Sequence, residues 1–468
     1  MNETLCAQQH AHSFRDPDGF IFTAGADLYR QINHSGKPAY DQLISSGLYQ
    51  ALIEDGSLIS HEEIHASRAL DAQSAYKVIA PQKIPFISYP YEWSFGQLQD
   101  AALLTLHLQK TALSHQMTLK DCSAYNVQFH RGRPVFIDTL SFEPYVEGTP
   151  WTPYRQFCQH FLAPLALMSF TDIRLSQLLR LYIDGVPLDL ASKLLPFKTR
   201  FNFSLQTHIH FHASAQKKHE TTSSAPSPKS GSGRVSRLAL MGLIDNLESA
   251  ARGLRWAPKG TEWGDYYENT NYSDAAFDAK KSAVDTFLTQ LDAQTVWDMG
   301  ANCGEFSRVA SQRGIPVVSF DIDPAAVEKN YRQVKREGDP LILPLTMDLT
   351  NPSPAIGWAN QERDALAQRG PTDTVLALAL IHHLAISNNL PLKQIARFFA
   401  SLCQKLIIEF VPKNDSQAQR LLSSRKDIFG EYDEPHFIEA FNQEFEIIAS
   451  TPIAGSQRTL FAMRARAR

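Results

Sequence analysis

The chain lacks the features that would assign it at once to a special class of protein. Its five cysteines among 468 residues are scattered, and no two have the C-x-x-C spacing of a zinc or redox site. The longest apolar run is VLALALI at 375–381, far short of the roughly 20 residues that cross a membrane. Charge of neither sign dominates, because 45 Lys and Arg stand against 49 Asp and Glu.

Each absence excludes a class. The odd number of cysteines fits a reducing compartment better than a disulfide framework. The first residues, MNETLCAQQHAHSF, have neither the basic nor the apolar part of a signal peptide. We therefore expect a cytoplasmic protein without a membrane segment. The formal charge of −4 disfavours a generally basic nucleic-acid binder, although a local basic groove stays open. The composition leaves the oligomeric state open.

One segment divides the chain by composition. Residues 215–236 are rich in Ser, Thr, Pro, Gly and Lys and nearly free of large apolar residues. Such a segment buries too little surface to offset the entropy lost on ordering. We predict a flexible linker here, between one domain at 1–214 and another at 237–468.

The C-terminal domain alternates strand-like and helix-like segments. Short apolar runs end in turns, and each is followed by a segment with helical periodicity. Strands that are apolar on both faces indicate a mostly parallel sheet covered by helices, which is an α/β fold. The predicted strands are TVWDMG, PVVSFDI, LILPLTMDL, TVLALALI and KLIIEFVP.

The first of these strands ends in a glycine turn, VWDMGANCGEF at 296–306. Such a turn before a helix points backbone N–H groups at whatever lies above it, and the helix terminus adds positive potential. Without Cβ atoms, Gly300 and Gly304 let a ligand approach the backbone closely. A tight turn with no ligand remains the alternative.

Polar side chains also follow the next strands. Asp321 ends the second strand, where a carboxylate can accept the hydroxyls of a ribose, and Asp348 ends the third. The fourth strand ends in IHHL at 381–384. One such acid can be a helix cap, but polar residues at three strand ends indicate a binding site.

The order DMGANCG, SFDID, TMD, DTVLALALIHHL and LIIEFVP resembles the motif series of class I methyltransferases that use S-adenosylmethionine. The resemblance implies a Rossmann-like, seven-stranded sheet whose last strand is antiparallel. It places Asp298 near the cofactor's amino group, Asp321 at its ribose and Asp348 at its adenine. An NAD dehydrogenase would need GxGxxG, from which Asn302 departs. The residues that the resemblance assigns to S-adenosylmethionine are Asp298, Gly300, Ala301, Asn302, Gly304, Asp321, Ile322, Met347 and Asp348.

By the same resemblance His382 and His383 lie on the side of the methyl acceptor. Either can serve as a general base where the acceptor carries a proton of high pKa; alternatively both shape the pocket. The motif Asn/Asp-Pro-Pro-Tyr/Phe of many nucleic-acid amino methyltransferases is absent. The acceptor stays unidentified, with small molecule, glycan, protein and RNA all open.

Two further groups flank this site in the sequence. The first consists of polar and aromatic residues that cap the cofactor or pack a helical lid: Trp263, Tyr266, Tyr267, Asn271 and Tyr272. The second follows the fifth strand and lies on the same rim of the sheet, with arginines that receive an anionic substrate or form a solvated helix face: Glu409, Lys413, Asp415, Arg420 and Arg425.

The N-terminal domain reads as α+β and contains a second constellation. In LKDCSAYNVQFHRGRPVFID, Asp121 precedes Asn126 by five residues, and Asp138 follows a short hairpin. This spacing resembles the catalytic loop and metal-binding Asp of protein-kinase-like and aminoglycoside-phosphotransferase-like folds. The resemblance implies Mg²⁺ on Asn126 and Asp138 if the domain binds a nucleotide.

The departures from that pattern favour a degenerate module that binds a substrate or nucleotide. Leu119 and Thr139 replace residues typical of the two motifs, no glycine-rich loop is evident, and Lys77 is a candidate for the phosphate-binding lysine. The structural alternative is that the acids cap turns and Asp138 pairs with an arginine such as Arg131. The two-part layout also resembles bacterial methyltransferases related to nodulation host-specificity proteins.

The sequence thus predicts an S-adenosylmethionine-dependent methyltransferase whose N-terminal domain contributes substrate binding or regulation. Two alternatives remain: a non-catalytic protein that binds S-adenosylmethionine, and a bifunctional enzyme with an N-terminal phosphotransferase.

Overall fold

The computed structural model describes residues 7–212, 234–258, 274–423 and 426–466. Contacts divide the chain into two compact units. Most of the predicted linker lies outside the described residues. The first unit comprises Met1–His130, Pro134–Trp256 and Ile356–Arg363, and the second Arg131–Arg133, Ala257–Ala355 and Asp364–Arg468.

The second unit is built on one seven-stranded sheet of order β12-β11-β10-β13-β14-β16-β15. The first five of these strands run parallel, and β16 is antiparallel to both β14 and β15. A seven-stranded sheet whose last strand in the sequence is antiparallel agrees with the sheet that the resemblance implied. The strands are β10 (Val296–Met299), β11 (Val317–Asp321), β12 (Ile342–Thr346), β13 (Thr372–Ala377), β14 (Cys403–Phe410), β15 (Phe445–Pro452) and β16 (Thr459–Ala465).

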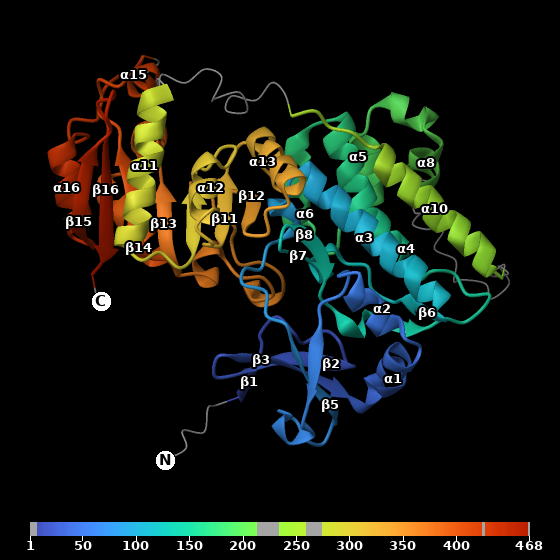
Figure 1. Cartoon of the computed structure of the whole chain (residues 1–468). Coiled ribbons are helices and arrows are strands. Elements are labelled where there is room, and N and C mark those ends of the chain that lie inside the picture. Colours follow the sequence, from blue (N-terminus) through green and yellow to red (C-terminus); the bar gives the residue numbers. More distant parts are fainter. Residues whose placement is uncertain (1–6, 213–233, 259–273, 424–425, 467–468) are drawn as a thin grey trace. The chain divides into compact units, whose positions relative to one another are not determined.

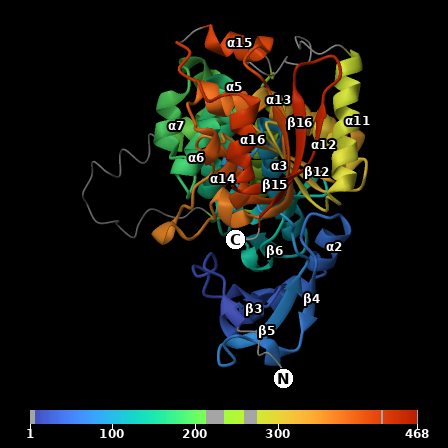
Figure 2. The same cartoon turned by 90° about the vertical axis from the view of Figure 1, so that its left-hand side faces the viewer.

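Helices pack on both faces of this sheet because its strands are apolar on both sides. Every residue of β10 and β11 is buried. One face shares a core with α11 (Asp274–Gln290), α12 (Glu305–Ser311) and α13 (Pro324–Glu337). Side chains alternate along β16, so Leu460 belongs to that core while Phe461 contacts Phe437 on the other face. Figure 2 shows α16 (Glu434–Asn442) beside β15, and α14 (Leu392–Leu402) packs against α16 and β14.

The strand order reverses between β10 and β13, which is where ligands bind in open α/β sheets. From β10 the chain continues outward to β11 and β12, then returns to the other side of β10 as β13. The loops at the carboxyl ends of these two strands therefore diverge and leave a crevice at that edge of the sheet.

The first unit contains a five-stranded antiparallel sheet of order β1-β2-β3-β5-β4. Two helices follow β3, α1 (Lys37–Ser45) and α2 (Leu48–Glu54), and Gly47 with φ 79° ends the helical path between them. The strands of this sheet are β1 (Ala7–Gln9), β2 (Gly19–Ala24), β3 (Asp27–Asn33), β4 (His61–Ile64) and β5 (Ala75–Pro81).

The long helix α3 (Phe95–Ser114) follows this sheet, and two small antiparallel pairs come after it. One pair is β6 (Met117–Leu119) with β9 (Phe142–Pro144), and the other is β7 (Val127–His130) with β8 (Arg133–Phe136). The predicted hairpin at Arg131–Gly132 is confirmed, with both residues at positive φ. Neither α3 nor any other described helix has the apolar length that a membrane crossing needs.

The boundary between the two units differs from the one predicted at residue 237. Helix α10 (Arg237–Gly253) packs along α3 within the first unit, as Figure 1 shows. Gln99 of α3 donates to the carbonyl of Ala251, and Lys110 pairs with Glu248 at 2.5 Å. The low-complexity segment could be predicted from composition. Composition does not determine which hydrophobic core the apolar face of the following helix, α10, packs into.

Candidate functional site

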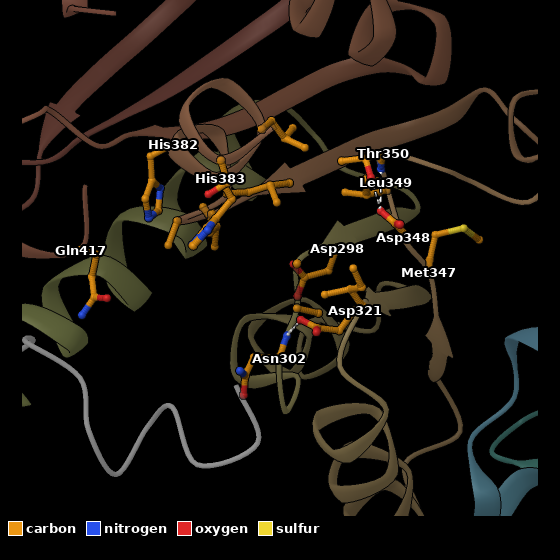
Figure 3. A pocket seen from close by; sticks show the side chains of 18 of the residues that line it. Asp298, Asn302, Asp321, Met347, Asp348, Leu349, Thr350, His382, His383 and Gln417 are labelled. Atoms are coloured by element: carbon orange, nitrogen blue, oxygen red, sulfur yellow. Dashed lines mark hydrogen bonds between the residues drawn. The ribbon is translucent and has the colours of Figure 1, made fainter. Parts of the chain in front are cut away.

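The carboxyl ends of the central strands of the second unit surround a cavity of about 330 Å³. This volume lies within the range of small-molecule sites. In Figure 3, Asp298, Asn302 and Asp321 lie together, with Asp348 near them, while His382 and His383 form a separate group. The predicted residues that line the cavity are Asp298, Gly300, Ala301, Asn302, Asp321, Ile322, Met347, Asp348, His382 and His383.

The turn after β10 is held to the neighbouring strand by its backbone. The N–H groups of Gly300 and Ala301 both donate to the carbonyl of Phe320, each at 2.9 Å. Gly300 and Asn302 adopt left-handed conformations, with φ of 80° and 52°. Asn302 is a residue type that tolerates this region, so the turn forms without a glycine at this position.

Gly304 does not line the cavity, which differs from its predicted role at the cofactor. It begins α12 with φ of 82°, and a Cβ at this position would lie 2.5 Å from the side chain of Asn330. Close packing of α12 against α13 and the left-handed backbone therefore both favour glycine at this position.

Asp298 is a buried carboxylate at the tip of β10, with 1% of its surface exposed. Its Oδ2 accepts a hydrogen bond of 2.6 Å from the hydroxyl of Ser307. Burial raises the pKa of Asp298 to about 7, and the hydrogen bond from Ser307 opposes part of that rise. A cationic group placed beside Asp298 would favour its charged form.

Asp321 ends β11 and accepts two backbone hydrogen bonds, from Asn302 at 2.7 Å and from Asp323 at 2.8 Å. Burial raises the pKa of Asp321 to about 6 against the effect of these bonds. Asp321 thus fixes the glycine turn and its own loop while lining the cavity.

Asp348 and its neighbours form the side of the cavity next to Asp321. Asp348 is half-buried, and its Oδ1 accepts hydrogen bonds from the backbone N–H and the hydroxyl of Thr350. Met347 is buried, whereas 55% of the surface of Ile322 is exposed. An exposed isoleucine at the mouth of a cavity offers apolar surface to a flat ring.

His382 and His383 lie after β13 with ring centroids 4.1 Å apart. Burial, together with the charge of Arg458, lowers the pKa of His383 to about 4. Burial also holds the pKa of His382 well below its ordinary value. Both imidazoles are therefore neutral at physiological pH and able to accept a hydrogen bond.

Comparison with known proteins identifies a relative that matches almost the whole chain. The chain is 36% identical over 455 residues to the nodulation protein NoeA of Rhizobium meliloti (strain 1021), across 96% of this chain and 95% of that protein. The chain belongs to the NoeA family. No protein-family model matches it.

Solved structures similar to this chain include three whose names describe methyltransferases. Magnesium protoporphyrin IX methyltransferase (ChlM) from Synechocystis PCC 6803 with bound SAH is 17% identical, at a TM-score of 0.30 over 43% of this chain and 91% of that chain. N-methyltransferase NodS from Bradyrhizobium japonicum WM9 is 10% identical, with TM-score 0.30 over 42% and 99%. The bifunctional kinase-methyltransferase WbdD is 15% identical, with TM-score 0.29 over 41% and 40%.

A buried network of charged side chains lies beside the cavity in this NoeA-family protein. Glu409 at the end of β14 pairs with Lys280 of α11 at 2.5 Å and with Arg458 at 3.2 Å. Arg458 also pairs with Asp415 at 2.8 Å. The Glu409 oxygen that pairs with Lys280, Oε2, also accepts a 2.7 Å bond from the N–H of Ala379. Burial lowers the pKa of Lys280, and the charge of Glu409 opposes that shift.

Sequence reasoning missed Lys280 because its helix precedes the recognised motifs and has no glycine or acid signature. It also extended the fourth strand through Ile381, whereas β13 ends at Ala377 and Ala379 adopts φ of 48°. The missed residues that line the cavity come from α11, from the start of α12, from the loops after β12 and β13, and from α15 (Ser416–Leu422). They are Phe277, Lys280, Phe306, Leu349, Thr350, Leu378, Ala379, Leu380, Leu384, Ser387, Asn388, Gln417 and Leu421.

The residues predicted on the rim after β14 lie in different environments. Glu409 and Asp415 join the buried network, while Lys413 pairs with Asp427 at 3.0 Å. Arg420 is exposed and does not line the cavity, in agreement with a solvated helix face. Five predicted residues of the cofactor cap and one rim arginine lie outside the described residues: Trp263, Tyr266, Tyr267, Asn271, Tyr272 and Arg425.

The second predicted constellation, in the first unit, is held by internal pairs. Asp138 forms an ion pair with Arg30 of β3 and accepts hydrogen bonds from Ser141 and from the N–H of Leu140. The pairing of Asp138 with an arginine was predicted, but the partner is not Arg131. Asn126 donates to the hydroxyl of Ser141 at 3.4 Å.

Two other residues of this constellation also have local partners. Asp121 accepts bonds from Ser123 N–H and from Gln156. Lys77, the candidate phosphate-binding lysine, lies in β5 and pairs with Glu63 of β4. It is therefore Arg30, not Lys77, that reaches Asp138.

Proposed function

We propose that the protein is a class I methyltransferase that uses S-adenosylmethionine. One observation carries the proposal: acids at the tips of three adjacent strands and a glycine turn line a single cavity at the point where the strand order reverses. Caps of helices and turns account for single acids, but not for three that meet at one cavity.

The residues present fit the cofactor in chemical type and in order along the sheet edge. Asp298 lies on the central strand and suits an amino group, while Asp321 on the next strand suits the two ribose hydroxyls. Asp348 follows β12, one strand further along, and suits the edge of an adenine, with Ile322 and Met347 as apolar surface beside it.

When bound, S-adenosylmethionine supplies an electrophilic methyl group that an acceptor takes by in-line displacement. The chain's own residues would then orient the two reactants and exclude water around them. The neutral imidazole of His383 lines the cavity and can take a hydrogen bond, or a proton where the acceptor carries one. A pKa near 4 suits positioning of the acceptor better than strong base catalysis.

Isothermal titration with S-adenosylmethionine tests this proposal. We expect binding to the wild-type chain and a loss of roughly 100-fold in Asp321→Asn, because the charged acceptor of the ribose hydroxyls is removed. Asp373→Asn is a matched control. Asp373 is the second residue of β13 and pairs with Lys405, so it lies near the amino end of the strand and does not line the cavity.

Absence of binding to the wild-type chain, or equal losses in the two variants, would contradict the proposal. Binding without transfer would favour the alternative of a non-catalytic S-adenosylmethionine sensor. A comparison of metabolites from deletion and wild-type cells separates the two, because an enzyme leaves acceptors that differ by one methylene unit in mass.

For the first unit we propose a kinase-like arrangement that binds substrate or regulates the enzyme rather than transferring phosphate. Support comes from a five-stranded sheet, a long helix, and acids after β6 and β8 in the order expected for that fold. Arg30 of β3 forms an ion pair with Asp138, the acid that follows β8. Because arginine does not deprotonate, a metal ion would have to displace it.

A further inference from the structure

Lys280 is a positively charged residue in a cavity whose other described charged residues are acids. Of the described residues that line the cavity, it is the one lysine or arginine, and the acids there are Asp298, Asp321 and Asp348. Its side chain is 3% exposed. A buried ammonium group is costly to desolvate, and its presence at a ligand cavity calls for a reason beyond stability.

The position of Lys280 along the sheet edge gives that reason. Asp348 and Asp321 follow β12 and β11 on one side of Asp298, whereas the partner of Lys280, Glu409, ends β14 on the other side. A ligand whose ribose lies at Asp321 and whose amino group lies at Asp298 would therefore direct its remaining end toward Lys280. In S-adenosylmethionine that end carries a carboxylate.

We propose that Lys280 binds the carboxylate of the cofactor's methionine part, so that Asp298 and Lys280 together recognise its amino-acid group. The assignment rests on the proposed function. An ammonium group has three donors and can hold Glu409 and a ligand oxygen at the same time. The charged pair formed in a buried cavity is stronger than one exposed to water.

Glu409 acts in this assignment as a positioning residue. It fixes the ammonium group of Lys280 through an ion pair of 2.5 Å, and it holds the left-handed turn at Ala379 through the 2.7 Å bond from that N–H. Arg458 neutralises the rest of its charge from the other side. The carboxyl-end loop of β13 and the helix that carries Lys280 are thereby tied to one carboxylate.

Two nucleosides test the assignment by titration calorimetry. S-adenosylhomocysteine contains the amino-acid group, whereas methylthioadenosine has the same adenosine and sulfur without it. We expect Lys280→Met to weaken S-adenosylhomocysteine by about 10- to 100-fold and to leave methylthioadenosine unchanged. Lys281→Met is a matched control on the same helix, because Lys281 pairs with Glu305 and does not line the cavity.

A second variant guards against a folding defect. Lys280→Met leaves a buried carboxylate with one cation fewer, so Lys280→Met/Glu409→Gln restores the charge balance, and thermal melting checks that both variants fold. Equal weakening of the two nucleosides, or no weakening of S-adenosylhomocysteine, would overturn the assignment alone. Failure of the wild-type chain to bind S-adenosylhomocysteine would overturn the proposed function, and the assignment with it.

Discussion

Asp298 combines burial, a short hydrogen bond from Ser307 and a position at the tip of the central strand. Its residue type and its place before the glycine turn were predictable from the sequence, because a strand followed by such a turn is a local pattern. Its raised pKa was not, because desolvation depends on the side chains that α11 and α12 bring over it.

The raised pKa of Asp298, about 7, leads to a prediction on pH. An amino cation binds the ionised carboxylate, so protonation of Asp298 competes with the ligand. We expect the affinity for S-adenosylhomocysteine to fall as pH decreases from 8 to 6, by up to about tenfold per unit below the pKa. Protons should be released on binding near pH 7, which titrations in buffers of different ionisation enthalpy measure. An affinity that stays constant over this range would contradict the role given to Asp298.

At the scale of elements, the alternation of strands and helices in the second unit was predictable and is confirmed by the structure. Periodicity and turn residues act over a few positions, so PVVSFDI and PAAVEKNYRQVKREG identify β11 and α13 directly. The end of β13 was not predictable in this way. The apolar run continues to Ile381, but the bond from Ala379 N–H to Glu409, on another strand, turns the chain out of the sheet.

The start of α12 provides a prediction on stability. Gly304→Ala should destabilise the protein by about 2 to 4 kcal/mol, because a Cβ there meets the side chain of Asn330 and the backbone is left-handed. Gly314→Ala is the control, with φ of 79° and nothing within 4 Å of the added Cβ. It should cost only about 1 to 2 kcal/mol of backbone strain. Urea unfolding midpoints measure both, and similar losses would show that contact with Asn330 is unimportant.

Over the whole molecule, the composition predicted two parts, but the chain passes from the first unit to the second after Trp256, not at the low-complexity segment. The membership of α10 was not predictable, because its buried residues Leu240, Ile244 and Leu247 suit either core until α3 is seen to supply the partner surface. The ion pair that Asp138 of the predicted metal site forms with Arg30 could not be predicted from the sequence either. Asp138 and Arg30 are far apart in the chain and meet only once β3 is folded.

A titration with Mg-ATP tests the first unit in the intact protein. We expect no binding to the wild-type chain, because the ion pair with Arg30 and the bonds from Ser141 and Leu140 occupy the carboxylate of Asp138. Arg30→Ala, which frees that carboxylate, is the informative comparison. Binding of Mg-ATP to the wild-type chain that disappears in Asp138→Asn would favour the bifunctional alternative instead.

The sequence by itself determined the α/β pattern of the second unit, the glycine turn and the acids that follow its strands. These features depend on neighbours a few residues away, where backbone preferences and side-chain alternation act. Only the tertiary structure decided that Lys280, Glu409 and Arg458 form one buried network and that Arg30 reaches Asp138. Such pairs join segments that are distant in the sequence. Their strength depends on the surroundings in which the partners are buried together, and no local sequence pattern contains that information.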